Sequence, residues 1–333
     1  MKKQTIKPDN VYLKSTFSSV GKKESEGPLN QYFDAKYKDD LLGQECWEKA
    51  ESTLLKTTVS GALTSAKLTC DELDMLFAGD LLNQCTASSF GLKAFDIPFF
   101  GLYGACSTFA EGLCLASMTI SGGFAKNCGV VTSSHFCSSQ KQYRFPLEYG
   151  EVRTPTSQWT VTGSGCAILS CDKSDIKITA VTPGRIVDLG VSDANNMGAA
   201  MAPAAADTIY SHLCETNKSP DDYDHIITGD LALVGSDLLC ELLKQKGIDI
   251  SKNHLDCGSL IFDAENQKVN AGGSGCGCVA SVFSGYIAKK LKSGEMKNIL
   301  LVATGALMSP SSLLLGESIS GVAHAVEFER AGD

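Results

Sequence analysis

The chain has 333 residues, of which 43% are hydrophobic, and it carries a formal net charge of −9. This length allows one large or two medium-sized domains with a substantial core, whereas the negative charge argues against a nucleic-acid-binding surface. Since the basic start lacks the apolar core of a signal peptide and no run of about 18 apolar residues follows, we expect a soluble, cytoplasmic protein.

The first predicted elements are a long helix and a short buried strand. Residues 44–63 carry apolar side chains at helical spacing, among them Trp47 and Leu54. An apolar strand follows within residues 74–79 and ends in Gly-Asp-Leu, so that Asp80 comes directly after it. The same D-x-x-x-x-G-D-L pattern returns at residues 224–231, where Asp230 takes the equivalent place. This recurrence indicates an internal duplication.

The stretch Gly101–Thr108 indicates a tight turn between a strand and a helix. It follows the apolar residues 97–100 and precedes an amphipathic stretch at 109–122. Cys106 is therefore expected at a helix N-terminus, where the helix dipole lowers a thiol pKa and favours a reactive thiolate. We predict that Cys106 reacts faster than the other cysteines. The alternative is that it is one small buried apolar residue among many cysteines.

The 14 cysteines are expected to be free thiols in a reducing compartment, because the chain shows no export signal and is too long to depend on a disulfide framework. No C-x-x-C pair occurs. The C-x-C at Cys276 and Cys278 lacks a second ligand pair at the spacing that zinc sites require. The sequence therefore predicts no metal site, and no motif in it indicates a cofactor.

The duplication continues along the rest of the chain. Lys126-Asn127 and Lys297-Asn298 both end a helix and enter an apolar strand, and the same offset places residues 104–106 over 275–277. We predict two βαβ-rich halves, residues 1–172 with the Cys106 elbow and residues 173–333 with a Gly272–Gly277 elbow. The two elbows should meet at the junction, where two helix N-termini would favour an anion.

Several motifs together resemble a known superfamily. The duplicated halves, the cysteine in A-C-S, the glycine elbow and the C-terminal A-V-E-F-E-R are similar to thiolases and ketoacyl synthases. Within that superfamily the chain resembles the stage V sporulation protein AD family of spore-forming bacteria. The motifs that carry this resemblance are A-G-D-L-L-N-Q, F-G-L-Y-G-A-C-S-T, T-V-T-G-S-G, M-G-A-A-M-A-P-A-A-A-D-T-I, N-A-G-G-S-G-C-G-C and V-A-T-G-A-L-M-S-P.

The resemblance implies a fold, a ligand and partners. The expected fold is α/β and thiolase-like, with layers in the order α-β-α-β-α. The implied ligand is dipicolinic acid (pyridine-2,6-dicarboxylic acid), free or as its calcium chelate, which the family takes up into the developing spore. The implied partners are a second copy of the chain, as a homodimer, and other membrane proteins of the stage V sporulation A system. Peripheral association with the forespore or spore inner membrane is implied as well.

Departures from the enzymes of the superfamily predict that the chain is not an enzyme. Condensation needs a group beside the cysteine that stabilises an oxyanion or moves a proton. Ketoacyl synthases place a histidine where this chain has residues 228–230, and thiolases have Gly-His-Pro where it has residues 273–276. Neither histidine is present, and residues 317–321 lack the second thiolase cysteine. The alternatives are an active acyltransferase that uses Cys106 and a structural protein with a vestigial pocket.

Some of the candidate site residues have a second interpretation. His135 follows a predicted strand and is expected to line the pocket, or else to be a capped loop residue. Arg144 lies in the basic, aromatic segment 140–146, which is a lid, a dimer element or a solvated loop. Asp80 either faces the ligand or caps a helix, and capping is expected for Asp230. The candidate ligand-binding residues are Cys106, Ser107, Asp80, His135, Gly273, Ser274, Gly275 and Arg144.

Overall fold

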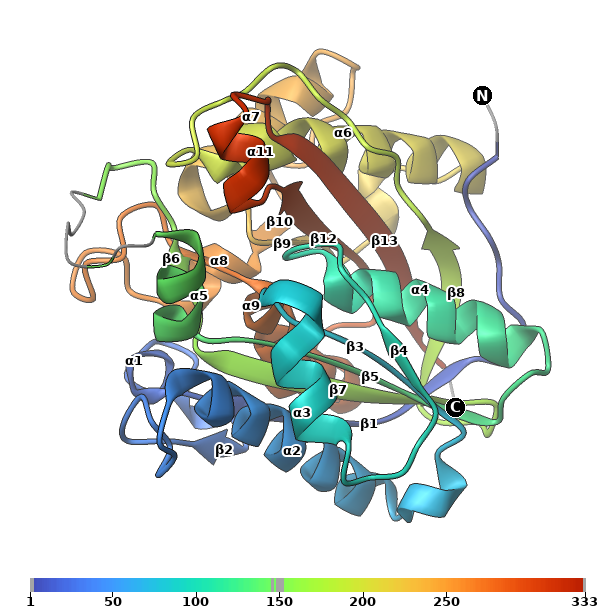
Figure 1. Cartoon of the computed structure of the whole chain (residues 1–333). Coiled ribbons are helices and arrows are strands. Elements are labelled where there is room, and N and C mark those ends of the chain that lie inside the picture. The colour runs from blue at the N-terminus through green and yellow to red at the C-terminus, as the bar shows by residue number, and fades with distance from the viewer. Residues whose placement is uncertain (1–2, 145–146, 148–152, 332–333) are drawn as a thin grey trace.

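The structure is a computed structural model that describes residues 3–144, 147 and 153–331. A sheet of eleven strands runs through the molecule in the order β10-β9-β12-β13-β8-β1-β7-β5-β3-β4, with the short β2 beside β1 (Figure 1). A second, two-stranded sheet pairs β6 with β11. The strands are β1 (Tyr12–Val20), β2 (Ala35–Lys36), β3 (Met75–Gly79), β4 (Phe99–Gly101), β5 (Asn127–Ser134), β6 (Trp159–Thr160), β7 (Gly163–Ser170), β8 (Ile176–Thr182), β9 (His225–Gly229), β10 (His254–Asp256), β11 (Gly273–Ser274), β12 (Asn298–Leu307) and β13 (Ser320–Arg330).

The order of the large sheet reads the same from both ends. Strands β4-β3-β5-β7-β1 of one half correspond to β10-β9-β12-β13-β8 of the other, and parallel and antiparallel pairs occur at the same places. In the described part of the chain, strands β1 and β8 pair only at Tyr12 and Lys177, so the sheet nearly divides there. The predicted boundary between residues 172 and 173 falls in the turn from β7 to β8.

The duplication extends to individual side chains. The carboxylate of Asp74 accepts hydrogen bonds from the backbone N–H groups of Lys126 at 2.7 Å and Asn127 at 2.9 Å. In the other half, Asp224 accepts the same pair of bonds from residues 297–298, at 2.6 and 3.1 Å. Each carboxylate therefore holds the start of a central strand beside its neighbour. This explains why an aspartate and a Lys-Asn pair recur together in the sequence.

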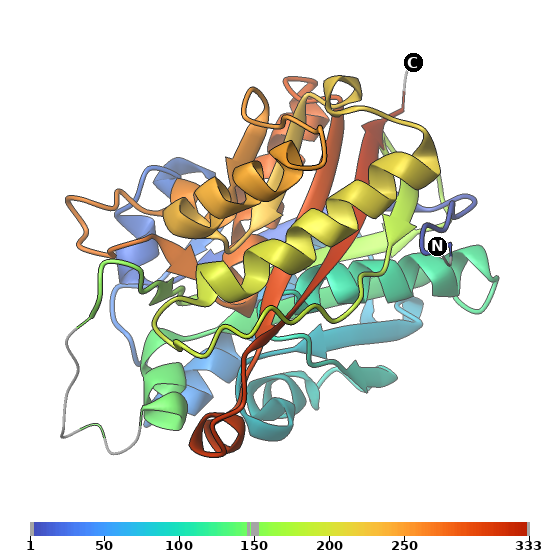
Figure 2. The same ribbon diagram turned by 90° about the horizontal axis from the view of Figure 1, so that it is seen from above.

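Helices form three layers around the two halves of the sheet (Figures 1 and 2). Helices α2 and α3 cover one outer face and α6 and α7 the other, whereas α4 and α9 contact strands between them. The layers therefore follow the predicted order α-β-α-β-α. The helices are α1 (Lys22–Ser25), α2 (Trp47–Ala66), α3 (Thr86–Leu92), α4 (Thr108–Ser121), α5 (Phe136–Tyr143), α6 (Met197–Thr216), α7 (Ala232–Lys244), α8 (Cys257–Ile261), α9 (Cys276–Val282), α10 (Ala288–Ser293) and α11 (Pro310–Leu314).

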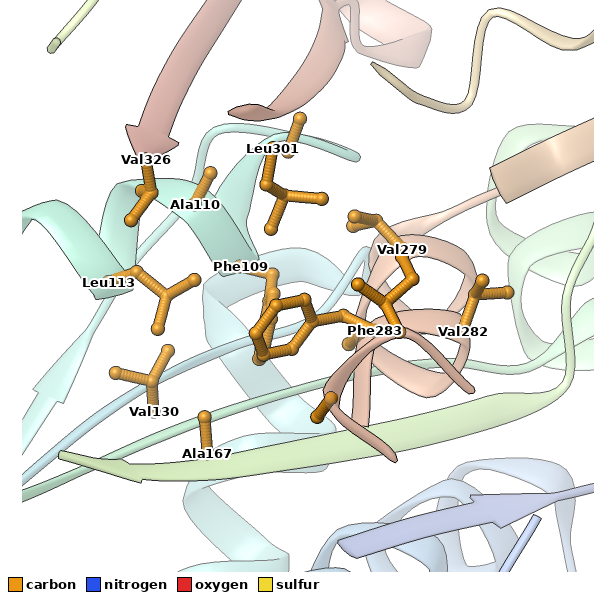
Figure 3. Packing of buried hydrophobic residues seen from close by; sticks show 14 of the residues in the cluster. Phe109, Ala110, Leu113, Val130, Ala167, Val279, Val282, Phe283, Leu301 and Val326 are labelled. Carbon is orange, nitrogen blue, oxygen red and sulfur yellow. The ribbon is translucent and has the colours of Figure 1, made fainter. Parts of the chain in front are cut away.

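The central helices are apolar on several sides because both halves of the sheet pack against them (Figure 3). Phe109 of α4 lies 5.6 Å from Phe283, which follows α9, and neither ring is exposed to solvent. Val130 of one half and Leu301 of the other complete the cluster. This packing holds the N-termini of α4 and α9 in place at the junction of the halves.

Two predicted boundaries differ from the structure. Helix α2 begins at Trp47 instead of residue 44, because Cys46 is still extended, and it continues to Ala66 before Lys67 turns left-handed at φ 58°. Residues 140–143 of the predicted lid segment belong to the last turns of α5. Residues 145–146 of that segment lie outside the described residues.

Candidate ligand-binding site

The two elbows meet at the junction of the halves, as predicted. Ala105 adopts a left-handed conformation at φ 51°, which turns the chain sharply before Cys106 and the start of α4. The Cys106 Sγ lies 3.3 Å from the Ser274 Oγ of the second elbow. The Cys276 thiol donates a hydrogen bond to the Ala105 carbonyl at 2.9 Å. Segments about 170 positions apart thus form one site.

A cavity of about 70 Å³ lies between the elbows. Both halves of the chain contribute to its wall. Ligand pockets for drug-sized molecules commonly measure about 300–1,000 Å³, so this cavity is too small for a long acyl chain, and side chains of its wall would have to move to admit a compact ligand. It is lined by Leu81, Tyr103, Ala105, Cys106, Ser139, Gln140, Tyr143, Arg144, Gln158, Thr160, Ala194, Met197, Ser274, Gly275, Ala306 and Met308.

Four of the predicted site residues line the cavity, namely Cys106, Arg144, Ser274 and Gly275. Two other residues of the elbows do not. Ser107 donates its hydroxyl hydrogen bond to the carbonyl of Gly104 at 2.6 Å and stabilises the turn itself. Gly273 pairs with Trp159 in the two-stranded sheet. Gly275 lines the cavity, but its backbone N–H donates to Asp230 at 3.0 Å.

The prediction that His135 lines the cavity is also wrong. Its Nδ1 accepts a hydrogen bond from the backbone N–H of Cys137 at 3.1 Å, which caps α5. The proton is therefore on Nε2, which donates to the carbonyl of Asp40 at 2.7 Å. Burial lowers the pKa of this imidazole. The ring is thus a neutral structural group, and its capped-residue interpretation is confirmed.

Asp80 serves the local structure and does not line the cavity. Its buried carboxyl group accepts hydrogen bonds from the backbone N–H groups of Leu82 at 2.9 Å and Ser88 at 2.8 Å. The second of these bonds satisfies a free N–H in the first turn of α3. Of the two interpretations offered for Asp80, helix capping is the one that the structure confirms.

Asp230, unlike Asp80, does not cap a helix, so the prediction that it does is wrong. The side chain of Asp256 caps α7 instead, with bonds from Leu231 N and Ala232 N at 3.0 and 2.8 Å. Asp230 is left-handed at φ 76° and fully buried, and its carboxyl group interacts with Cys106. Burial raises the pKa of this carboxyl group well above its ordinary value. The repeated G-D-L pattern was the available sequence signal for this residue.

The wall of the cavity contains polar side chains that sequence reasoning missed. The hydroxyl groups of Tyr103 and Tyr143 lie 3.0 Å apart, and burial raises the pKa of both phenols. Gln158 donates to the carbonyl of Asp230 at 2.6 Å, and its own amide oxygen has no partner among the described residues. Tyr103 and Tyr143 lie in segments that the sequence analysis singled out, but their pairing and the position of Gln158 depend on tertiary packing.

The environment of Cys106 reverses the expected shift of its pKa. Burial, followed by the nearby Asp230, raises the pKa of the thiol to about 12. This outweighs the favourable effect of the N-terminus of α4, so Cys106 is a thiol and not a thiolate at neutral pH. None of the five histidines is among the residues that line the cavity in the described part of the chain.

We therefore expect Cys106 to react slowly, contrary to the sequence-based prediction. At pH 8 a thiol with a pKa of about 12 is ionised in only about one molecule in 10⁴. Brief treatment with iodoacetamide followed by peptide mass spectrometry should label the exposed Cys171 and Cys214 well before Cys106. Labelling in denaturant is the control, because it should remove the difference. Preferential labelling of Cys106 in the folded protein would contradict this result.

The five-layer α/β fold, duplicated about a junction where a cysteine elbow faces a glycine elbow, defines a thiolase-like protein. Solved structures with this fold include 3-oxoacyl-[acyl-carrier-protein] synthase III from Aquifex aeolicus VF5, with a TM-score of 0.58 and 15% identity, covering 96% of this chain and 99% of that one. A cerulenin-bound OleA of Xanthomonas campestris matches with a TM-score of 0.60 and 14% identity, covering 97% of each chain. At these identities the likeness shows the fold alone.

The chain belongs to the stage V sporulation protein AD family, whose sequence profile matches residues 2–329. A relative, stage V sporulation protein AD of Bacillus subtilis (strain 168), is 44% identical over 322 residues, which are 97% of this chain and 95% of the relative. The chain is thus a sporulation protein on a thiolase-like scaffold. Within the described residues, no helix is long and apolar enough to cross a bilayer, and no three metal-ligating side chains gather into a site.

Proposed function

We propose that the cavity between the elbows binds dipicolinic acid and that the chain takes part in its uptake into the developing spore. The observation that carries this proposal is that Arg144 lines a small cavity together with the thiol of Cys106 and the hydroxyl of Ser274. A guanidinium group matches a carboxylate, and the thiol and hydroxyl are further donors. Membership of a sporulation family supports the biological setting.

The chemistry of the wall suits a flat, rigid dianion. Met197 and Met308 are apolar and deformable, and they offer contacts to an aromatic ring. The raised pKa of Asp230 favours binding, because burial disfavours an ionised carboxylate beside Cys106 that would repel the ligand. A rigid ligand also loses little conformational entropy on binding. Calorimetric titration with the free acid and with its calcium chelate tests the proposal, and failure of both to bind would refute it.

We infer that the chain is not an acyl-transferring enzyme, although the Cys106 elbow resembles that of the condensing enzymes. The support is the raised pKa of the Cys106 thiol and the absence of histidine from the described wall of the cavity. A nucleophilic cysteine needs a thiolate or an adjacent base. Formation or cleavage of acetoacetyl-CoA that disappears in Cys106→Ala would establish the enzymatic alternative.

We further propose a place of action. The chain would act from the cytoplasm, associated peripherally with the forespore or spore inner membrane, beside other membrane proteins of the stage V sporulation A system. This rests on the family resemblance. Fractionation of sporulating cells would test it, and recovery of the chain only in the soluble fraction would count against membrane association.

A homodimer formed through β4 is also proposed. Strand β4 ends the sheet order and, among the described residues, pairs only with β3; Phe99 on it is 40% exposed. An unpaired apolar edge is a template for a second copy.

We expect the wild type to be a dimer by light scattering and Phe99→Lys to be a monomer with little change in thermal unfolding. Phe124→Lys, at an apolar residue that is 78% exposed elsewhere, is the control and should stay dimeric. A monomeric wild type, or a dimeric Phe99→Lys, would contradict the proposal.

A further inference from the structure

A second hollow lies beside the cavity and shares two of its residues. This outer groove, of about 320 Å³, is lined by Trp47, Phe136, Cys137, Gln140, Arg144, Leu147 and Arg153. Gln140 and Arg144 also line the inner cavity. The two hollows are therefore neighbours, separated by side chains of α5 and the residue that follows it. A small molecule in the groove would be next to the inner cavity.

The guanidinium of Arg153, which lines the outer groove, contacts an aromatic ring and leaves two of its nitrogen atoms unpaired within the described residues. Its guanidinium lies 4.7 Å from the centre of the Trp159 ring, and that ring stacks on Phe136 with the centroids 3.9 Å apart. The Nε and Nη2 atoms are buried, and neither has a hydrogen-bond partner among the described residues. A buried charged donor without a partner is costly. These two atoms form the side of the guanidinium that binds a carboxylate with two parallel hydrogen bonds.

Positive charge gathers around the same ring. The Nζ of Lys23 lies 4.3 Å from the centre of Trp159, on the ring that Arg153 also contacts. Burial lowers the pKa of the Arg144 guanidinium, and the nearby charge of Arg153 lowers it further. Three cations thus lie near one another in a chain whose net charge is −9. An anion in the groove would relieve their repulsion.

We propose that the outer groove is a subsite for the carboxylate of a small aromatic acid, which Arg153 holds before the acid passes to the inner cavity. A change of the Arg153 rotamer would turn the Nε and Nη2 donors toward the carboxylate, and the apolar walls from Trp47, Phe136 and Leu147 would contact the ring of the acid. This proposal rests on the proposed function of the inner cavity. Arg153, which lies outside the inner cavity, would be the first residue to contact the ligand.

The chain contains only two tryptophans, and both adjoin the outer groove, so intrinsic fluorescence reports on it directly. Titration with pyridine-2,6-dicarboxylate should change the tryptophan emission of the wild type. Arg153→Gln should weaken this response about tenfold or more, because it removes a charged two-bond contact. Arg153→Lys should weaken it as well, because it keeps the charge and loses the paired donors. An unchanged response in both variants would overturn the proposal.

Control variants show whether a change in response comes from the outer groove, from the inner cavity or only from the loss of a positive charge. Arg185→Gln removes the same charge from a guanidinium that pairs with Asp207, and its response should match the wild type. Cys106→Phe fills the inner cavity without adding a tryptophan, so it should keep the fluorescence response and lose the calorimetric binding to the inner cavity. If Cys106→Phe and the wild type bind equally by calorimetry, the proposed function fails instead. Inorganic phosphate at equal ionic strength should give a weaker response, because it can pair with the guanidinium but has no ring to contact the apolar walls. A response equal to that of the acid would overturn the assignment to aromatic carboxylates.

Discussion

Replacing Cys106 by tryptophan is expected to abolish binding of dipicolinic acid to the inner cavity. The Cys106 side chain is only 5% exposed and lines a cavity of about 70 Å³, so an indole at this position would occupy the space of the ligand. Isothermal calorimetry should show loss of the binding event assigned to the inner cavity at ligand concentrations that saturate the wild type.

The substitution is expected to leave the protein folded. Adding bulk to a packed interior typically costs about 1–3 kcal/mol, compared with a total stability of about 5–15 kcal/mol for a typical domain. The existing cavity should take up part of the added volume. Cys106→Ser is the matched control, because it keeps the size of the side chain and should still bind. Equal binding by wild type and Cys106→Trp would show that the ligand site lies elsewhere.

Replacing Gly305 by alanine is expected to disrupt both stability and ligand binding. Gly305 lies on β12, and a Cβ atom there would come within 2.1 Å of the carbonyl oxygen of Gly104 and 3.1 Å of the Ser107 nitrogen. The strand has little freedom to move away, because β13 pairs with it at Gly305 and β9 pairs with it as far as Ala303. The Cys106 elbow must therefore shift, at a cost of about 2 kcal/mol or more in the free energy of unfolding.

Denaturant unfolding and calorimetry together would measure this effect. Gly101→Ala is the control, since Gly101 lies near the same elbow and its added Cβ would meet only side-chain atoms, the nearest at 3.3 Å. We expect Gly101→Ala to unfold close to the wild type and to bind normally, whereas Gly305→Ala unfolds at lower denaturant and binds at least about tenfold more weakly. Wild-type stability and binding in Gly305→Ala would mean that the two halves do not need this close approach.

The sequence by itself determined the architecture and the position of the site. The repeated D-x-x-x-x-G-D-L and Lys-Asn patterns predicted that β3 corresponds to β9 and β5 to β12, because the same local turns and apolar strands recur in both halves. The turn before Cys106 and the glycines around Ser274 likewise predicted two elbows that meet. Such features depend on local backbone preference and on hydrophobic periodicity, which a single sequence contains.

Only the tertiary structure decided what each polar residue does. Asp80 and Asp230 occupy equivalent places in the repeat, yet one caps α3 and the other lies against Cys106, because different segments pack beside them. The pKa of Cys106 depends on burial and on Asp230, which is far away in the sequence, and not only on the adjacent helix N-terminus. The role of a polar or ionisable group is set by desolvation and by its nearest partners, and those are known only once the chain has folded.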